Sequence, residues 1–384
     1  MPLDGIVVAD FSRVLAGPLA TMTLADLGAR VIKIERPGSG DDTRTWGPPW
    51  SEHGSTYFES VNRGKESIAL DLFDADDLST AKTLAARADV VIHNFKHGTM
   101  ERLGLGYDDV KAVNSAVVYC AVSGFGSSEG RDLLGYDFIV QAVGGLMSIT
   151  GHPGEPMKAG VALIDVLTGK DATIGILAAL AARSRTGLGD FIEVSLLSSG
   201  LAALVNQGQA ALETGIAPSG RSNQHPSIAP YETLRARDAE FAVACGNDGQ
   251  FARLAQALDL TELAQDDRFD TNPHRVEHRE ELVTVLEARL ASEDADTWVA
   301  RLNAADVPAG KVNSVPEAIE LASSLGLRPL VKVGAGHTPQ LRHPIDWTNH
   351  RPSRPTAPPQ LGEQDRDVRR WLAHTTSPEN DTQR

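Results

Sequence analysis

The sequence contains little cysteine and shows no metal-binding pattern. Only two cysteines occur in 384 residues, Cys120 and Cys245, and neither belongs to a CxxC pair or another metal-ligand spacing. A disulfide between them is possible, but two cysteines in dissimilar surroundings favour a reducing compartment, and we expect a cytoplasmic protein. The 11 histidines also lack ligand spacing, so we expect no metal site.

Long apolar runs and a surplus of positive charge are missing as well. The longest largely apolar run, at 172–182, is too short to span a bilayer and indicates a buried helix. The first residues show no basic region followed by an apolar stretch, so we expect no secretory signal. The formal charge of −15 argues against binding to nucleic acids or anionic membranes, and a polyanionic ligand would need a local cluster of arginine and lysine.

The usual nucleotide-binding motifs are also absent. The segment 12–18 occupies the place where a dinucleotide-binding fold carries GxGxxG, but it lacks those glycines. Glu35 stands where such folds bind a ribose, yet without the glycines a nicotinamide site is unsupported. The patterns GxxxxGK[ST] and HExxH are missing too, which argues against P-loop proteins and zinc proteases.

What is present is a regular alternation of strand and helix patterns. With 41% hydrophobic and 23% charged residues, the chain has the composition of a folded protein of two or three domains. Apolar runs at 5–10 and 29–35 flank a helix at 17–28, which makes one βαβ unit. Further strands are predicted at 67–71, 89–93, 116–122 and 191–194, and further helices at 78–86, 136–150, 161–182 and 196–214. This pattern predicts an α/β fold with a large Rossmann-like domain and an open, mostly parallel sheet.

The character of the sequence changes after about residue 215. Residues 216–225 are rich in glycine, serine, proline and asparagine, which indicates a linker. A strand at 240–244 and charged helical segments up to about residue 305 then predict a smaller α+β domain. We therefore divide the chain into 1–215, 226–310 and 311–384, and we expect the polar end at 375–384 to be frayed.

One acidic residue stands out in an apolar context. Asp165 lies within the apolar segment 160–169, in the first turns of the predicted helix 161–182. A buried carboxylate is costly unless it is paired or used in chemistry, which favours a functional group. A carboxylate that simply complements the positive end of the helix would give the same pattern. Both interpretations remain open at this point.

Basic residues follow several of the predicted strands. Arg36 follows the second strand, and Lys96 and Arg102 lie in the segment after 89–93, close to Phe95. Because the carboxyl ends of parallel strands meet at one crevice, this placement favours an anion site there, although the charges could also be scattered and solvated. The segment 246–250, which contains two glycines, follows a strand and can be either a simple turn or a mobile lid.

Taken together, the motifs resemble those of the family III coenzyme A transferases, the group that contains formyl-CoA transferase. The resemblance covers nearly the whole chain. Its segments are 10–18, 28–38 with Gly40 and Asp41, 62–65, 94–95, 135–137, 144–145, 160–165, 246–250, 268–269, 271–272 and 307–310. Each segment alone is a weak signal, but their shared order is a specific one.

The resemblance implies a site and a reaction. Asp165 matches the family's nucleophile, and Tyr136 and Asp137 match positions near the reacting centre. The segment Gly246, Asn247, Asp248, Gly249 and Gln250 matches a loop that closes over the active site. Residues that match the coenzyme A site are Val14, Ala16, Arg36, Leu70, Asn94, Phe95, Arg102, Leu103 and Tyr136.

The resemblance also implies the partners and the assembly. The expected substrates are an acyl-CoA and a carboxylic acid, with coenzyme A as a substrate and no permanently bound cofactor. The family fold implies an obligate homodimer of two interlocked rings, with residues 311–384 returning to the large domain.

One departure from the family pattern and two alternative functions remain. Leu15 stands where formyl-CoA transferase carries a glutamine that assists the chemistry, so a strict formyl-CoA and oxalate specificity is doubtful. An α-methylacyl-CoA racemase would share the fold, but it needs two acid–base groups and carries a histidine where this chain has Tyr136. A non-catalytic acyl-CoA binding protein is the second alternative.

Overall fold

The computed structural model describes residues 1–350 and 354–374, so the end predicted to be frayed, 375–384, lies outside the described residues. The chain divides into two compact units. The first consists of Met1–Leu146, Ala159–Ile216 and Arg328–Arg384, and the second of Met147–Lys158 and Ala217–Leu327. The second unit therefore continues beyond residue 310, the predicted end of the small domain.

A six-stranded parallel sheet forms the centre of the first unit. Its strands are β1 (Val7–Asp10), β2 (Arg30–Glu35), β5 (Lys65–Ala69), β6 (Val90–His93), β7 (Val118–Ser123) and β8 (Asp190–Ser195). Their order in the sheet is β5-β2-β1-β6-β7-β8, and every neighbouring pair is parallel. The chain order reverses between β1 and β6, as in doubly wound nucleotide-binding sheets. The predicted α/β class and parallel sheet are thus confirmed.

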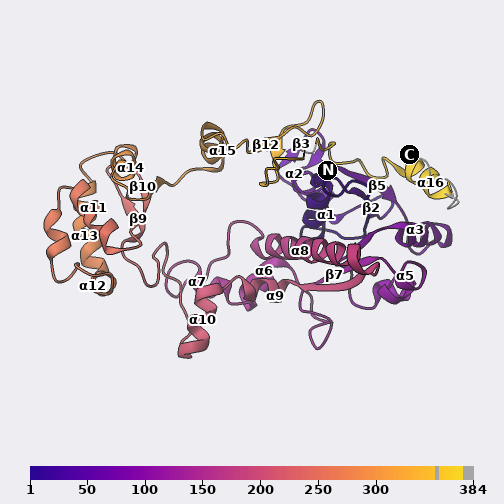
Figure 1. Cartoon of the computed structure of the whole chain (residues 1–384), viewed down its shortest axis with the longest axis horizontal. Helices are drawn as coiled ribbons and strands as arrows, with labels where there is room; N and C mark the ends of the chain where they lie inside the picture. The colour runs from indigo at the N-terminus through magenta and orange to yellow at the C-terminus, as the bar shows by residue number, and fades with distance from the viewer. Residues whose placement is uncertain (351–353, 375–384) are drawn as a thin grey trace. The chain divides into compact units, whose positions relative to one another are not determined.

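Helices cover both faces of this sheet (Figure 1). One face packs against α1 (Ala16–Asp26) and α8 (Leu163–Thr186). The other face packs against α3 (Ala75–Arg87), α5 (Tyr107–Val113) and α16 (Asp365–Ala373). Successive residues of β1 show the alternation, since Val8 belongs to the first core and Ala9 to the second. None of the helices formed by the described residues combines the length and apolarity that a bilayer crossing requires.

Two long predicted helices are broken in the structure. The prediction of one helix at 136–150 is wrong, because α6 (Asp137–Val143) ends at Gly144 and α7 (Leu146–Ile149) starts anew. Gly145 between them has φ +86°, a left-handed conformation that glycine adopts readily and that ends a helix. The predicted helix 196–214 is likewise two helices, α9 (Leu196–Ala202) and α10 (Val205–Thr214), with Val205 at φ +43°.

The remaining elements of the first unit are short. They are η1 (Asp42–Thr45), β3 (Trp50–Ser51), β4 (Gly54–Ser55), α2 (Thr56–Ser60), α4 (Thr99–Arg102), β12 (Leu330–Val331) and β13 (Gln340–Leu341).

The second unit combines a small antiparallel sheet with helices. Its sheet has the order β11-β10-β9, with β9 (Tyr231–Arg235), β10 (Glu240–Ala244) and β11 (Ala309–Lys311). Its helices are α11 (Asp248–Ala257), η2 (Thr261–Gln265), α12 (Asn272–Glu277), α13 (Arg279–Leu290), α14 (Ala295–Ala304) and α15 (Val315–Ser324). Phe241, Phe251 and Trp298 are fully buried in its core.

Candidate functional site

A cavity of about 800 Å³ opens in the first unit at the carboxyl ends of the parallel strands. Its walls come from the loop after β1, the segment after β6, the loop after β7 and the start of α8. This is the position where the strand order reverses, and open α/β sheets bind their ligands at such a point. The fold therefore provides one crevice for a ligand where the sequence analysis expects it.

The structure brings six of the predicted site residues to this cavity. Those that line it are Val14, Ala16, Asn94, Phe95, Tyr136 and Asp165. Four predicted coenzyme A residues do not line it. Arg36 and Arg102 are exposed, Leu70 is buried in the core beneath the sheet, and Leu103 packs against that same core.

Other cationic side chains line the cavity in place of Arg36 and Arg102. They are Arg13, Lys96 and Arg131. The Arg13 guanidinium lies 5.2 Å from the centre of the Phe95 ring. Arg13 lies three residues after the end of β1, so its position in the loop after a strand was the available signal in the sequence. The described residues contain no group of three or more His, Cys, Asp or Glu side chains that could hold a metal ion.

Asp165 is the third residue of α8, and Asp137 caps that helix from α6. One carboxylate oxygen of Asp137 accepts hydrogen bonds from the N–H of Ile164 (2.8 Å) and of Asp165 (3.3 Å). Its other oxygen accepts from the Gln141 amide at 2.7 Å. Asp137 thus positions the helix end that carries Asp165, although it does not itself line the cavity.

The Asp165 carboxyl group has an unusual electrostatic setting. The residue is only 9% exposed. Burial, followed by repulsion from Asp137, raises the pKa of Asp165 to about 7. From the ordinary pKa of aspartate, one would expect a fully ionised carboxylate at neutral pH. Instead, Asp165 exchanges its proton near neutrality, which is typical of reactive groups.

A glycine allows α8 to approach the start of α1, directly after the loop that follows β1. A Cβ at Gly169, one turn after Asp165, would lie 2.7 Å from the carbonyl oxygen of Ala16. Any other residue would push the two helices apart. The small residue therefore helps to bring Asp165 and the loop to the same cavity.

Two tyrosines lie near the carboxyl pair. Tyr136 immediately precedes α6, is 60% exposed and lines the cavity. Tyr57, on α2, was not found from the sequence. Burial, and then the charges of Asp165 and Asp137, raise the pKa of Tyr57 to about 12, which keeps its phenol protonated at neutral pH. No spacing in the sequence links Tyr57 to them.

The segment 246–250 forms the start of a helix in the second unit. The Asn247 side chain caps α11 by accepting from the N–H of Gln250 at 2.9 Å. The Gln250 side chain accepts from the N–H of Gly246 at 2.7 Å, and Asp248 pairs with the buried Arg275 at 2.6 Å. Of the two interpretations of this segment, a simple turn is wrong, because Asp248 and Gly249 already belong to α11.

Comparisons with known proteins give a consistent result. The sequence model of CoA-transferase family III matches residues 3–365. Succinyl-CoA:glutarate CoA-transferase of Mus musculus is 39% identical over 372 residues, which cover 96% of this chain and 85% of the relative. Acetyl-CoA:oxalate CoA-transferase of Acetobacter aceti is 40% identical over 375 residues, covering 97% and 96%. A solved CAIB/BAIF family protein from Brucella suis, 41% identical, superimposes with a TM-score of 0.88 over 97% of this chain and 99% of that chain.

Proposed function

We propose, for a chain that belongs to CoA-transferase family III, that Asp165 transfers coenzyme A through covalent intermediates. The chain is an enzyme that uses coenzyme A thioesters as substrates. The observation that carries the proposal is the setting of Asp165. This carboxylate is buried and lines the cavity, and the neighbouring charge that shifts its pKa is another carboxylate, Asp137, rather than a cation.

The proposed reaction proceeds by exchange at two carbonyl groups. An Asp165 oxygen attacks the thioester carbonyl, and the carbon–sulfur bond breaks. The products are a mixed anhydride of Asp165 with the donor acid and the thiolate of coenzyme A. The thiolate then attacks the Asp165 carbonyl and releases the donor acid, which gives an aspartyl-CoA thioester. The acceptor carboxylate then attacks the aspartyl-CoA thioester and displaces the thiolate, which gives a second mixed anhydride. The thiolate attacks the acceptor's carbonyl in this anhydride, which releases the new acyl-CoA and restores the Asp165 carboxylate. No net proton is gained or lost.

We place coenzyme A in the cavity of the first unit. Arg13 and Lys96 are suited to its phosphates, since both follow strands at the crevice and line the cavity. Asn94 and Phe95 contribute the adjoining wall. The resemblance adds Arg36, Leu70, Arg102 and Leu103, which lie outside the cavity and would extend the binding surface.

For the substrates, we propose succinyl-CoA as donor and a short dicarboxylic acid as acceptor. The names of the mouse and Acetobacter relatives support short dicarboxylates. Leu15 lines the cavity where formyl-CoA transferase carries a glutamine, so glutarate is the first acceptor to test and oxalate the second.

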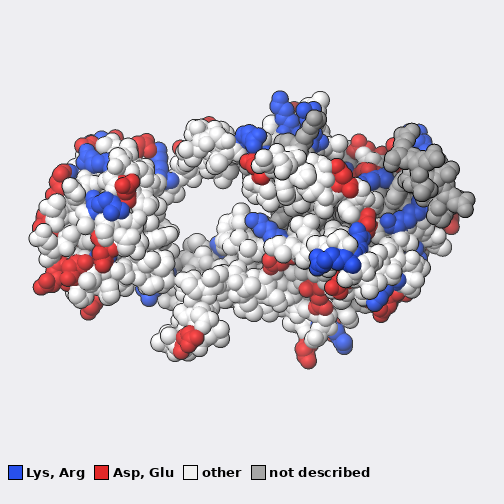
Figure 2. Space-filling model, in the orientation of Figure 1, with Lys and Arg blue, Asp and Glu red and all other residues white. Residues whose placement is uncertain are grey.

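We further propose the interlocked homodimer that the family resemblance implies. Helix α10, in the first unit, and helix α15, in the second, have no buried residue. Their exposed apolar residues include Val205 and Leu212 on α10 and Val315 and Leu321 on α15, and the surface over both helices is mostly uncharged (Figure 2). A second copy of the chain would cover these faces. In the resulting dimer, the segment 246–250 would close over an active site. We keep the cytoplasm as the proposed location.

The decisive experiment is mass spectrometry of the intact protein mixed with succinyl-CoA, with hydroxylamine as a trap. We expect a hydroxamate on Asp165 in the wild type and none in Asp165→Asn. A modified residue other than Asp165, or full exchange activity in Asp165→Asn, would refute the aspartyl mechanism. Light scattering tests the dimer, and a monomer at micromolar concentration would contradict it.

A further inference from the structure

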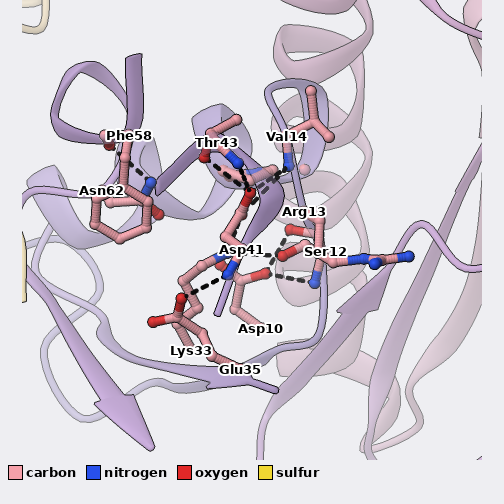
Figure 3. Close-up of polar contacts among 12 residues, drawn as sticks. Asp10, Ser12, Arg13, Val14, Lys33, Glu35, Asp41, Thr43, Phe58 and Asn62 are labelled. Atoms are coloured by element: carbon pink, nitrogen blue, oxygen red, sulfur yellow. Dashed lines mark hydrogen bonds and ion pairs between the residues drawn. The ribbon is translucent and has the colours of Figure 1, made fainter. Parts of the chain in front are cut away.

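The loop between β1 and α1 is held by side chains from other parts of the chain. Five backbone groups of residues 12–14 take part. The N–H of Ser12 donates to Asp10 (2.9 Å), and its carbonyl accepts from Lys33 (2.8 Å). The N–H and carbonyl of Arg13 both bond to the Asn94 amide (2.9 and 2.7 Å). The N–H of Val14 lies 3.3 Å from both carboxylate oxygens of Asp41. The loop therefore takes its shape from polar side chains, of which Asp10, Lys33 and Asp41 are buried (Figure 3).

Val14 has a backbone conformation that a β-branched residue rarely adopts. Its φ is +71°, in the left-handed region where the branched side chain crowds its own backbone. Such a conformation persists only where the surroundings impose it, and it is frequent at ligand sites. Val14 also lines the cavity, so the strained residue is part of the ligand-binding wall.

Lys33 and Asp41 form the buried centre of this arrangement. Lys33 Nζ lies 2.8 Å from Asp41 Oδ2, and both side chains are 0% exposed. Asp41 is itself fixed, because it accepts from the N–H and hydroxyl of Thr43 (3.0 and 2.8 Å), and its own N–H donates to Glu35 at 3.0 Å. The pair therefore forms hydrogen bonds to the loop at Ser12 and at Val14, on either side of Arg13.

Stability alone does not explain this pair. A buried ion pair loses much of its attraction to the cost of removing both charges from water, and apolar residues of similar size are often as stable. Apolar residues could not, however, accept a hydrogen bond from the N–H of Val14 or donate one to the carbonyl of Ser12. The contacts to the loop are what the charged pair adds.

We propose that Lys33 and Asp41 are positioning residues that hold the β1–α1 loop in its strained form and thereby set the affinity for coenzyme A. This inference rests on the proposed function, because it assumes that the loop wall of the cavity contacts coenzyme A. Neither side chain touches the reacting atoms, so the pair acts on binding rather than on the chemical step.

The first test is Asp41→Asn, which keeps the size of the side chain and removes its charge. We expect the Kd for free coenzyme A, measured by calorimetry, and the KM for succinyl-CoA to rise about tenfold, as for the loss of a hydrogen bond to a charged group. We expect kcat to stay within about twofold, since the chemical step is untouched.

The matched control is Asp26→Asn. Asp26, the last residue of α1, forms a buried pair with Arg63 at 2.6 Å in the same unit. It makes the same kind of interaction far along the helix from the loop. An equal rise in Kd for Asp26→Asn and Asp41→Asn would show a general loss of stability and overturn the proposal.

The second test removes the strain instead of the pair. Glycine adopts a φ of +71° without steric cost, so in a Val14→Gly background the effect of Asp41→Asn on Kd should shrink from about tenfold to about threefold. If Asp41→Asn raised the Kd by the same factor with and without Val14→Gly, the proposal that Asp41 holds Val14 in its strained conformation would be contradicted. If Asp41→Asn does not fold, Lys33→Met with Asp41→Asn leaves no unpaired charge and should show the same rise in Kd, and an unchanged Kd would refute the proposal.

These outcomes separate the inference from the proposed function. A wild-type protein that binds no coenzyme A would refute the proposed site as a whole. If the wild type binds coenzyme A and Asp41→Asn binds it equally well, only the positioning role of Lys33 and Asp41 would be refuted.

Discussion

Two buried carboxylate sites of the first unit have opposite electrostatics. Asp10, at the end of β1, is fully buried. Burial raises its pKa, but Lys65 and Lys33 outweigh that effect and bring the pKa of Asp10 down to about 2. Asp165, at the start of α8, is also buried, but its neighbour is Asp137, and the pKa of Asp165 rises to about 7. Burial raises the pKa of both carboxyl groups; cations beside Asp10 reverse this effect, whereas the carboxylate beside Asp165 adds to it.

The difference distinguishes a carboxylate with structural contacts from the one that we propose as the nucleophile. Asp10 keeps its charge and accepts from the hydroxyl of Thr21 (2.6 Å) and from Lys65 Nζ (3.1 Å). Its lone pairs are engaged, and it fixes backbone and side chains. Asp165 lacks such a cation, and its carboxylate remains available at the cavity. Pairs of acids with pKa values pushed apart by their surroundings commonly mark this division of labour.

The largest test of this comparison is the activity of Asp165→Asn. If Asp165 is the nucleophile, kcat for exchange should fall by about 10⁴- to 10⁶-fold, the range over which enzymes lose activity when one member of a covalent catalytic group is removed. The measurement is transfer from succinyl-CoA to glutarate. Coenzyme A binding by calorimetry is the control and should persist. A loss of activity below about tenfold would mean that Asp165 is not the reactive carboxylate.

The next test concerns the structural member of the comparison. Asp10→Asn leaves Lys65 without its carboxylate in the interior, so we expect a loss of about 3 kcal/mol in the free energy of unfolding at pH 7. Because the folded pKa of Asp10 is depressed, this contribution is present above the ordinary pKa of 3.8 and is lost as the pH falls through about 2. Urea denaturation measures it. Equal midpoints for wild type and variant at pH 7 would show that the charge of Asp10 has no structural role.

The sequence revealed more of the fold than of these two sites. Apolar runs with turn signals were enough for the sheet, because strands buried on both faces are nearly continuous in hydrophobicity. The break at Gly144 and Gly145 was missed because both glycines stand in an otherwise apolar, helix-like segment. In that case the backbone conformation of one residue, Gly145 at φ +86°, overrides the pattern.

The site was only partly predictable for a related reason. Asp165 was conspicuous because its neighbours in the chain are apolar. Lys33 and Asp41 were not, because charged residues near strand ends are usually solvated, and their burial depends on contacts across the fold. The raised pKa of Asp165 has the same origin, since Asp137 is its neighbour only in space. Sequence patterns report local burial well, but they do not report which charges meet.

A third test uses the stability of the same Asp165→Asn variant, which should change in the opposite direction to that of Asp10→Asn. The folded pKa of Asp165, about 7, lies above its ordinary value of 3.8, so the folded protein holds the extra proton between those values. Stability from this group is complete below about pH 4 and is lost as the pH rises through about 7. The neutral amide avoids that loss.

We therefore expect Asp165→Asn to be more stable than the wild type by about 2 kcal/mol at pH 8 and nearly unchanged at about pH 4. This is roughly half of what the full shift gives at about 1.4 kcal/mol per pKa unit, because the positive end of α8 favours the ionised form. Urea denaturation at the two pH values measures the effect. A variant less stable than the wild type at pH 8 would contradict a strained carboxylate at this position.

The smallest expected effect separates the two causes of the raised pKa. Asp137→Asn keeps the acceptor for the N–H groups of Ile164 and Asp165 but removes the repelling charge. Because burial is the larger cause and Asp137 the smaller, the pKa of Asp165 should fall by about one unit. If Asp165 attacks as the carboxylate, as we propose, kcat/KM should rise with pH through about 7 in the wild type and through about 6 in the variant. Asp171→Asn, an exposed carboxylate further along α8, is the matched control and should leave the profile in place. A profile of Asp137→Asn that stays at the wild-type position would mean that burial alone raises the pKa, and the comparison between the two carboxylate sites would then rest on solvent exclusion rather than on the sign of the neighbouring charge.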